Sequence, residues 1–385
     1  MKRITLAHQT LFAELQQQCL DAAFDEQFPE NGSFVTKTLK GKKYWYYEGY
    51  STTSGGQTEA RKYSKYVGPH SDAEISKRVE AFRRSKTSYR ERRSLVTSLR
   101  DIGLPTPPAF VGDVVEVLWK AGIFRLRGVL VGTLAYQTYA GLLGVRLPAT
   151  PIMTGDVDFA QFHAVSMLVD DTMPPMLETL QSVDKTFRER LHLESGSTTA
   201  YVNETGFSVE FLTPNRGSDD NAGQPAKMPA LGGASAQALR YLDFLIRNPV
   251  QSVLLHKGGV AVTVPAPERY AVHKLVVSNL RLNDKAGYAK ARKDAVQSGL
   301  LIEALTLNSR DADLGFAWME AWERGSRWQE NLVVGRKRLT PEQINLLRAA
   351  VSVACKHESK SLDDYGFKDM PESDTVPGNA TSPRR

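Results

Sequence analysis

The sequence predicts an α+β fold. Three observations support this class. Short strand-like runs with alternating side chains occur between residues 128 and 264, amphipathic helical segments dominate after residue 266, and residues 1–110 have a separate, basic pattern of their own. At 385 residues the chain is long enough for two or three domains. We therefore expect a small basic α/β module, a core of strands and helices, and a C-terminal helical region.

The composition excludes several classes of protein. Hydrophobic residues make up 41%, which is ordinary for a globular protein, and no apolar run reaches about 18 residues. The first residues lack an apolar segment of the signal-peptide kind, so neither a membrane span nor a signal peptide is expected and the cytoplasm is the default location. Cys19 and Cys355 are far apart, which argues against a disulfide framework and a structural zinc site.

The N-terminal module begins with a helix over residues 5–27, which places four leucines roughly on one side. Three strands and a long helix follow, and the sequence Ser-Thr-Thr-Ser-Gly-Gly at 51–56 predicts a turn. The strands are expected at 34–38, 43–50 and 61–67, and the helix at 71–99. Residues 103–110 contain three prolines and mark the boundary of the module.

Charge is concentrated in this module. Between Lys37 and Arg100 there are 16 Lys or Arg and 6 Asp or Glu, a local net charge of +10. Aromatic residues lie between the cations at 42–47 and 62–66. Such a mixture suits nucleic acid, because cations contact phosphates and rings stack on bases. The alternative is a hairpin whose rings pack on each other while its lysines stay in water.

The central segment carries a strand, a turn and a helix. A helix is predicted at 112–121, a strand ends at Val131, and a helix runs from Gly132 to Leu143. The free backbone N–H groups at the start of that helix, at Gly132 and Thr133, offer a phosphate site, although threonine also caps many helices without binding anything.

Two acids on the following strand, predicted at 156–161, point to a metal. Side chains alternate along a strand, so Asp156 and Asp158 share a face while Val157 and Phe159 point into the core. The two carboxylates are separated by roughly 7 Å, two residues of strand rise, and can hold a divalent cation between them. Without a cation they repel each other, so a purely structural role is disfavoured.

Glu210 supplies a third acid. Residues 206–212 alternate, with Phe207, Val209 and Phe211 on the buried face and Glu210 on the other face. An exposed Glu on a strand is common, but together with Asp156 and Asp158 on the earlier strand it suggests a two-metal site. Residues 214–236 are rich in Gly, Asn, Asp and Pro and are expected to form an exposed loop or insertion.

The C-terminal third is mostly helical. A hairpin is expected at 252–264 around His256-Lys257-Gly258, followed by a helix that opens at Pro267. Lys274 lies off the predicted core face of that helix. A second helix, at 286–305, carries Lys290 and Asp294, and the simplest interpretation of these charges is a solvated face. A last helix is predicted at 340–356, and a disordered tail from about residue 358.

The order of these features resembles the nucleotidyltransferase fold typified by DNA polymerase beta. The resemblance rests on strand, Gly132-Thr133, helix, then Thr154-Gly155-Asp156-Val157-Asp158, then Glu210 on a later strand. The helix Pro267–Leu275, followed by Lys290 and Asp294, is similar to a bacterial branch with AbiE-type abortive-infection proteins and tRNA-modifying toxins. The resemblance covers about residues 112–310. Thr133 replaces the usual Ser and keeps its hydroxyl, whereas the insertion before residue 236 has no counterpart.

The resemblance implies a mixed-sheet core and metal-assisted nucleotidyl transfer. Asp156, Asp158 and Glu210 would be the catalytic carboxylates and would hold Mg²⁺ or Mn²⁺. An NTP such as ATP is the implied co-substrate, bound by Gly132, Thr133 and Lys274, with Lys290 and Asp294 as further contacts to nucleotide or acceptor. Implied partners are an RNA acceptor, most plausibly tRNA, on the basic module, and an antitoxin or other protein.

Two other functions remain open from the sequence. The protein could be a catalytically reduced, nucleic-acid-binding or partner-binding component of a toxin–antitoxin or defence system, or a phosphotransferase. The expected organisation is a basic module at 1–110, a nucleotidyltransferase core at 111–265, a helical domain at 266–357 and a disordered tail at 358–385.

Overall fold

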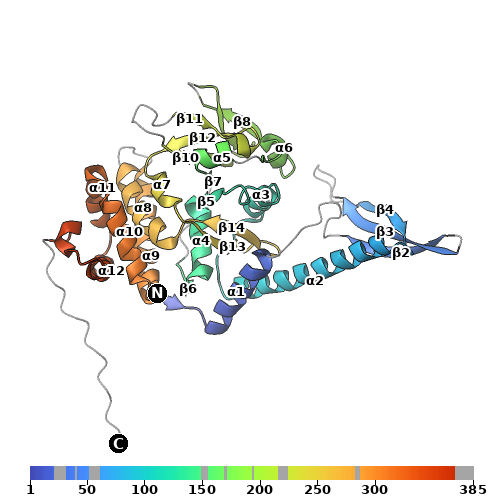
Figure 1. The fold of residues 1–385 in the computed structure, drawn as a ribbon, viewed down its shortest axis with the longest axis horizontal. Helices are drawn as coiled ribbons and strands as arrows, with labels where there is room; N and C mark the ends of the chain where they lie inside the picture. Colours follow the sequence, from blue (N-terminus) through green and yellow to red (C-terminus); the bar gives the residue numbers. More distant parts are fainter. Residues whose placement is uncertain are drawn as a thin grey trace, which may run out of the picture.

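The computed structural model describes residues 1–20, 32–39, 41–51, 61–148, 155–168, 171–192, 195–215, 224–281 and 287–368 (Figure 1). The end of the predicted first helix, most of the predicted turn at 51–56, and residues 369–385 of the predicted tail lie outside these ranges.

A mixed seven-stranded sheet forms the centre of the body, which confirms the predicted α+β class. Its main path runs β11-β12-β10-β7-β5, with β9 paired to both β10 and β8. β10 is parallel to β7 and β12, whereas β5 is antiparallel to β7. The strands are β5 (Val129–Val131), β7 (Asp156–Ala160), β8 (Arg188–Leu191), β9 (Thr198–Val202), β10 (Ser208–Pro214), β11 (Pro225–Lys227) and β12 (Ser235–Leu239).

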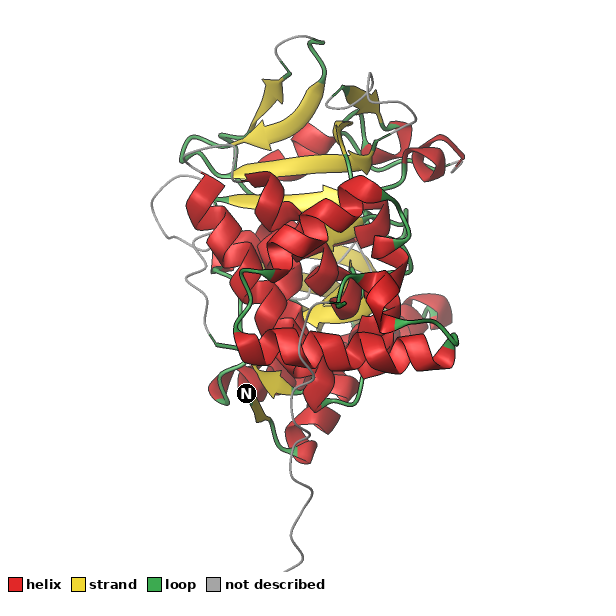
Figure 2. Ribbon diagram, turned by 90° about the vertical axis from the view of Figure 1, so that its left-hand side faces the viewer, coloured by secondary structure: helices red, strands yellow, loops and turns green. Residues whose placement is uncertain are grey.

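Helices cover this sheet, and those of the C-terminal third stack together beside it. Figure 2 shows them in front of the strands, with α8 packed on α9 and α11. Among the described helices, none is long and apolar enough to cross a membrane. The helices are α3 (Ala109–Lys120), α4 (Gly132–Leu142), α5 (His163–Leu168), α6 (Met176–Gln181), α7 (Leu242–Leu245), α8 (Pro267–Leu280), α9 (Gly287–Leu307), α10 (Asp311–Trp322), α11 (Ser326–Arg336) and α12 (Pro341–His357).

Smaller elements complete the body. The predicted hairpin is present as β13 (Val250–Leu254) and β14 (Val260–Val264), which pair antiparallel. β1 (Lys2–Arg3) pairs with β6 (Val145–Arg146), and α1 (Leu6–Leu20) packs on β13, β14 and α2. Two short 3₁₀ turns occur at Pro229–Leu231 and Leu362–Tyr365.

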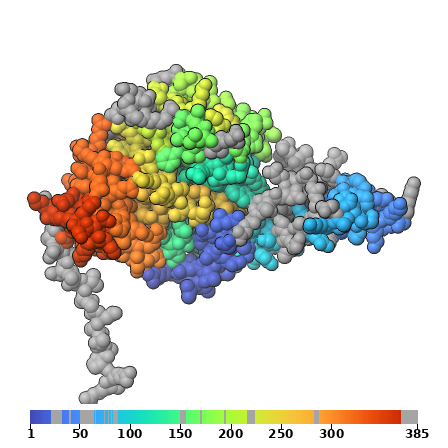
Figure 3. Space-filling model, in the orientation of Figure 1, coloured from blue at the N-terminus to red at the C-terminus, as the bar shows by residue number. Residues whose placement is uncertain are grey.

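The N-terminal module is a three-stranded antiparallel sheet at the far end of a long helix. Its elements are β2 (Ser33–Leu39), β3 (Lys42–Ser51), β4 (Arg61–Pro69) and α2 (Ala73–Asp101). Trp45 and Tyr47 pack with Phe34 and Phe82 in a second, small core. Figures 1 and 3 show the sheet as a narrow extension beyond the body.

The other face of the module's sheet is aromatic. Tyr44, Tyr46 and Tyr66 lie there, with ring centroids of Tyr44 and Tyr46 at 6.0 and 5.5 Å from that of Tyr66. The side chain of Tyr66 is 53% exposed, and Lys37 Nζ lies 4.7 Å from the Tyr46 ring centroid. Strand alternation therefore divides the aromatic residues between a buried face and a solvent face.

Three expectations differ from the structure. Residues 214–236 were expected to form an exposed loop or insertion, but within them lie β11 and the start of β12, because the small apolar residues between the glycines and prolines reach the core. Residues 359–368 were expected to be disordered, but Tyr365 and Phe367 are buried. Lys274 was placed off the core face of its helix, but it is buried, because α8 has neighbours on nearly every side.

Candidate active site

Three carboxylates come together where β7 and β10 lie side by side. In the parallel register, Glu210 is directly opposite Asp158, and Ser208 is opposite Asp156. Adjacent strands are about 4.8 Å apart, so Glu210 and Asp158 are neighbours across the sheet. Along β7, Val157 and Phe159 are buried and the two aspartates are half-buried. The alternation predicted from sequence is therefore present on both strands.

The electrostatics of Asp158 reflect this crowding. Burial, followed by the negative charges of Asp156 and Glu210, raises its pKa to about 7, while Lys274 and Arg281 act in the opposite direction. A carboxyl group with so high a pKa is under-compensated by the protein's own cations. An added cation would relieve this repulsion.

The side chain of Glu210 accepts hydrogen bonds from Arg190 on β8 and from Ser208 on its own strand. Arg190 Nη2 on β8 donates to Glu210 Oε1 at 2.8 Å, and Ser208 Oγ donates to the same oxygen at 3.2 Å. The Arg190 side chain is 51% exposed, so this ion pair contributes little stability and can open. Arg190 was not among the residues predicted from sequence, because no local motif links β8 to Glu210.

The turn at Gly132 brings the backbone against Asp158. Gly132 has φ +67°, and a Cβ atom there would lie 2.5 Å from Asp158 Oδ2, so only glycine fits. Tyr270 Oη on α8 donates to the Gly132 carbonyl oxygen at 2.9 Å, which fixes the turn from below. Thr133 Oγ1 accepts a hydrogen bond from Lys293 Nζ at 3.2 Å.

A buried group of charges lies beside this turn. Asp294 is fully buried, and its two oxygens accept from Lys274 Nζ at 2.6 Å and from Arg281 Nη1 at 2.5 Å. Burial lowers the pKa of Lys274, and the nearby Asp294 raises it again in part. Asp294 thus fixes two cations near Asp158 instead of facing solvent itself.

A cavity of about 690 Å³, a size typical of small-ligand sites, lies beside the Gly132 turn. Gly132, Asp158, Lys274 and Arg281 line part of it, whereas Asp156 and Glu210 do not. His273 also lines it, is 8% exposed, and has a pKa lowered to about 3 by burial and by the charges of Lys274 and Arg281. The rest of the lining is mainly apolar and comes from β10, β12, α7 and α8: Leu212, Ala238, Leu239, Leu242, Leu245, Val277 and Leu280.

The structure thus brings together most of the residues proposed from sequence. Asp156, Asp158, Glu210, Gly132, Thr133, Lys274 and Asp294 form one neighbourhood. Lys290 is exposed on α9 and does not line the cavity, while Lys293, one turn of helix further on, reaches Thr133. Arg281 and Tyr270 were also not among the proposed site residues, since their partners are distant in sequence.

A second group of metal-type ligands lies between α3 and the β13–β14 turn. Atoms of Asp113, Glu116 and His256 all lie within 4.8 Å of one another, and in the part of the chain that the structure describes this is the one such group. However, Lys257 Nζ lies 2.6 Å from Asp113 Oδ1 and 2.7 Å from Glu116 Oε2. Burial by itself would raise the pKa of Asp113 and Glu116. Hydrogen bonds from Lys257 to both acids, from His256 to Asp113 and from Lys120 to Glu116 outweigh burial, so both pKa values lie below their usual range. Lys257 and Lys120, which lies 2.8 Å from Glu116 Oε1, already balance the two negative charges of this group.

The carboxylates on β7 and β10 fit a divalent metal better. They supply only oxygen ligands, which Mg²⁺ and Mn²⁺ prefer. Their mutual repulsion, seen in the raised pKa of Asp158, is the condition that a bound cation offsets.

Comparison with known proteins agrees with this arrangement. A family model described as nucleotidyltransferase matches residues 109–323, which is more than half of the chain. The matched segment runs from α3 through α10 and includes β7, β10 and the Gly132 turn, whereas the N-terminal module lies outside it. No match to the chain was found among curated proteins or among solved structures.

Proposed function

Because the chain belongs to the nucleotidyltransferase family, we propose that it transfers a nucleoside monophosphate from an NTP to a hydroxyl group of an acceptor and releases pyrophosphate. The observation that carries this proposal is the pairing of Glu210 with Asp158 beside the Gly132 turn. We place the protein in the cytoplasm, where NTPs are available.

Each group at the site has a proposed task. Asp156, Asp158 and Glu210 would hold Mg²⁺ or Mn²⁺, and the bound metal would supply a lower pKa for the attacking hydroxyl and a counter-charge for the triphosphate. Glu210 is also the proposed acceptor of the proton of that hydroxyl, and its ion pair with Arg190 would have to open first.

The NTP occupies the large cavity, with its phosphates toward the Gly132 turn. Gly132 and Thr133 supply the start of α4, and Lys274 and Lys293 supply positive charge. Asp294 positions Lys274, which is a different task from the direct nucleotide contact first expected. Lys290 remains a proposed contact to the acceptor because its side chain is exposed.

We propose RNA, most plausibly tRNA, as the acceptor. The exposed Lys42 and Lys43 and the tyrosine face of the module combine cations with rings that bases can stack on. The family branch suggested by sequence adds a role in toxin–antitoxin or defence systems, with an antitoxin as a further partner. ATP is the first NTP to test.

The decisive experiment measures incorporation of each labelled NTP into total cellular RNA with and without Mg²⁺. We expect metal-dependent labelling and pyrophosphate release that are lost in Asp156→Ala and kept in Asp113→Asn, which alters the other candidate metal group. Loss of labelling in Asp113→Asn but not in Asp156→Ala would indicate that the catalytic metal binds at Asp113, Glu116 and His256 instead.

Two outcomes would favour the alternatives. Release of NDP instead of pyrophosphate would indicate phosphotransfer. RNA binding without any labelling, equal in wild type and Asp156→Ala, would indicate a catalytically reduced binding protein.

A further inference from the structure

His273 is a buried polar group in the wall of the proposed nucleotide cavity. Its side chain is 8% exposed and belongs to the cavity lining. The ring atom Nδ1 is sealed from solvent, and neither it nor Nε2 hydrogen-bonds to a residue that the structure describes. Folded proteins rarely leave a buried nitrogen in this state, because it is paired with water in the unfolded chain. Since Nδ1 is sealed, Nε2 is the ring nitrogen that a ligand in the cavity can reach.

The imidazole of His273 is neutral. Burial, and after it the charges of Lys274 and Arg281, lower the pKa of His273 to about 3. A neutral imidazole has one N–H group and one acceptor nitrogen. With no acceptor beside Nδ1, the N–H group belongs on Nε2, because an unpaired buried N–H is costly. His273 therefore offers a hydrogen-bond donor without a charge, which suits the uncharged part of a nucleotide better than its phosphates.

Helix α8 presents two adjoining edges to the cavity, and His273 belongs to the less polar one. Side chains that are three, four or seven residues apart share one side of a helix. The first edge carries polar groups that contact the Gly132 turn or Asp294, namely Tyr270, Lys274 and Arg281. The second edge consists of His273, Val277 and Leu280. A ligand whose charged end lies at the first edge would place an uncharged part at the second.

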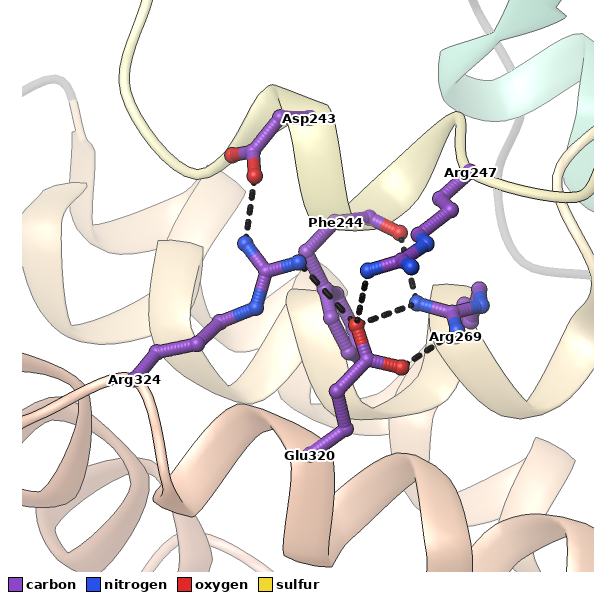
Figure 4. A network of polar contacts seen from close by, with 6 residues as sticks. All are labelled: Asp243, Phe244, Arg247, Arg269, Glu320 and Arg324. Atoms are coloured by element: carbon purple, nitrogen blue, oxygen red, sulfur yellow. Dashed lines mark hydrogen bonds and ion pairs between the residues drawn. The ribbon is translucent and has the colours of Figure 1, made fainter.

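The apolar lining is also held in place. Helix α7 contributes Leu242 and Leu245 to it and packs on α8. A polar network ties α7 to α8 and α10 (Figure 4), and its members are Asp243, Phe244, Arg247, Arg269, Glu320 and Arg324. Within it, Arg269 Nη1 on α8 donates to the carbonyl oxygen of Phe244 at 3.2 Å, and Arg269 Nη2 donates to Glu320 on α10 at 2.5 Å. Because α7 is fixed in this way, the cavity is preformed and little ordering is needed when a ligand binds.

We propose that His273 hydrogen-bonds the base of the bound NTP and thereby selects which nucleotide is transferred. The proposal rests on the proposed nucleotidyl transfer, with the phosphates of the NTP at the Gly132 turn. A base has apolar faces and a polar edge, so its faces fit the leucine and valine lining while an acceptor atom on its edge accepts a hydrogen bond from Nε2. A base that places an amino group or a carbon atom opposite Nε2 leaves this N–H unpaired and is rejected.

The test measures how tightly the full-length protein binds the α,β-methylene analogues of ATP, GTP, CTP and UTP in the presence of Mg²⁺. These probes keep the base, the sugar and the triphosphate charge but cannot release pyrophosphate. His273→Leu is the central variant, because leucine has nearly the volume of histidine and matches the apolar lining but cannot form a hydrogen bond. Val277→Ala is the matched control, because Val277 lies one turn from His273 on the same edge and offers only apolar contact, which every base can make.

We expect wild type to prefer one analogue over the weakest by about tenfold or more. His273→Leu should weaken the preferred analogue by about tenfold and change the weakest one little. Its melting temperature should be unchanged or raised, because the ring hydrogen-bonds to no described residue in the ligand-free protein. Val277→Ala should weaken all the analogues by a similar factor. The same order and spread of affinities in wild type and His273→Leu would overturn the proposal. So would a change in the ratio of ribose to deoxyribose analogues that is equal for every base, which would place the ring at the sugar.

A measurement on wild type alone covers the case in which His273→Leu does not fold. Inorganic triphosphate lacks both base and sugar, so it should bind more weakly than the preferred analogue by about tenfold or more. Equal binding of the two would show that the cavity does not recognise the base and would overturn the proposal.

Labelled NTP incorporation by the same preparations separates this proposal from the proposed reaction. Labelling of RNA by wild type, combined with the same preference among the analogues in wild type and His273→Leu, would reject the base contact alone. A preference that is lost in His273→Leu, with no labelling of any acceptor by wild type, would support the base contact and reject the reaction.

Discussion

Replacing Asp158 with Asn should stabilise the metal-free protein while abolishing transfer. Asn has nearly the shape of Asp but carries no charge, so the variant isolates the cost of ionising a carboxyl group that is half-buried next to Asp156 and Glu210. The loss of activity follows from the loss of a metal ligand.

The magnitude follows from the pKa of Asp158, which is raised to about 7 in the folded protein. An unfolded Asp has a pKa of about 3.9, so the folded state keeps its proton to higher pH. The free energy of unfolding therefore falls as pH rises from about 4 to about 7 and changes no further above that range. At 1.36 kcal/mol per pKa unit, a difference of about three units costs about 4 kcal/mol as an upper value.

Urea unfolding in EDTA at pH 4, 6 and 8 measures this cost. The stability gap between Asp158→Asn and wild type should be near zero at pH 4 and should open to a few kcal/mol by pH 8. Added Mg²⁺ should raise the stability of wild type more than that of the variant. A variant that is less stable than wild type at pH 8 in EDTA would refute the electrostatic argument and would favour a structural role for Asp158.

Three further predictions concern the surroundings of the site. Lys274→Met leaves the buried Asp294 with Arg281 as its single paired cation, so the free energy of unfolding in urea should fall by about 3 kcal/mol. An unchanged free energy of unfolding would show that the Lys274–Asp294 pair is not buried in solution. Gly132→Ala forces an L residue into a left-handed conformation against Asp158 Oδ2, so the free energy of unfolding should fall by about 1–3 kcal/mol and most of the transfer activity should be lost. Full activity of this variant would contradict the geometry of the turn. Changing both Lys42 and Lys43 to Glu should weaken RNA binding and leave NTP binding intact. The slope of log affinity against log salt concentration should become shallower by about 0.7–0.9 per lost phosphate contact. Unaltered RNA labelling would exclude the module as the acceptor surface.

Local alternation was sufficient to predict the carboxylate faces. Asp158 and Glu210 each have buried apolar neighbours on both sides in sequence, and Asp156 is followed by the buried Val157. Because side chains alternate along a strand, the three acids must lie on the opposite face from these apolar residues. The Gly132 turn could be predicted for a similar reason, since strand, glycine and helix follow each other directly. The roles assigned to these residues are still predictions.

Long-range partners could not be predicted. Lys274 looks solvated in sequence because its partner Asp294 belongs to another helix, and Arg190 reaches Glu210 from a strand with no apolar residue to mark it except Leu191. Residues 225–239 were misassigned because glycine and proline at 223–233 suggested a loop, whereas alanines at 226, 234, 236 and 238 fill the space against β10. The ranges of the proposed domains are still untested.

Helix α2 separates the N-terminal module, which is the proposed acceptor surface, from the body that holds the carboxylates. Phe82 belongs to the module's core and Val96 to the core of the body, so 14 residues, or about 21 Å of helix, separate the two. In Figure 1 the module and α11 lie at opposite sides of the molecule. If RNA is the acceptor, as we propose, a short RNA at the carboxylates would not reach the module, whereas a longer RNA would gain from both contacts at once. The distance set by α2 would then favour acceptors long enough to span it.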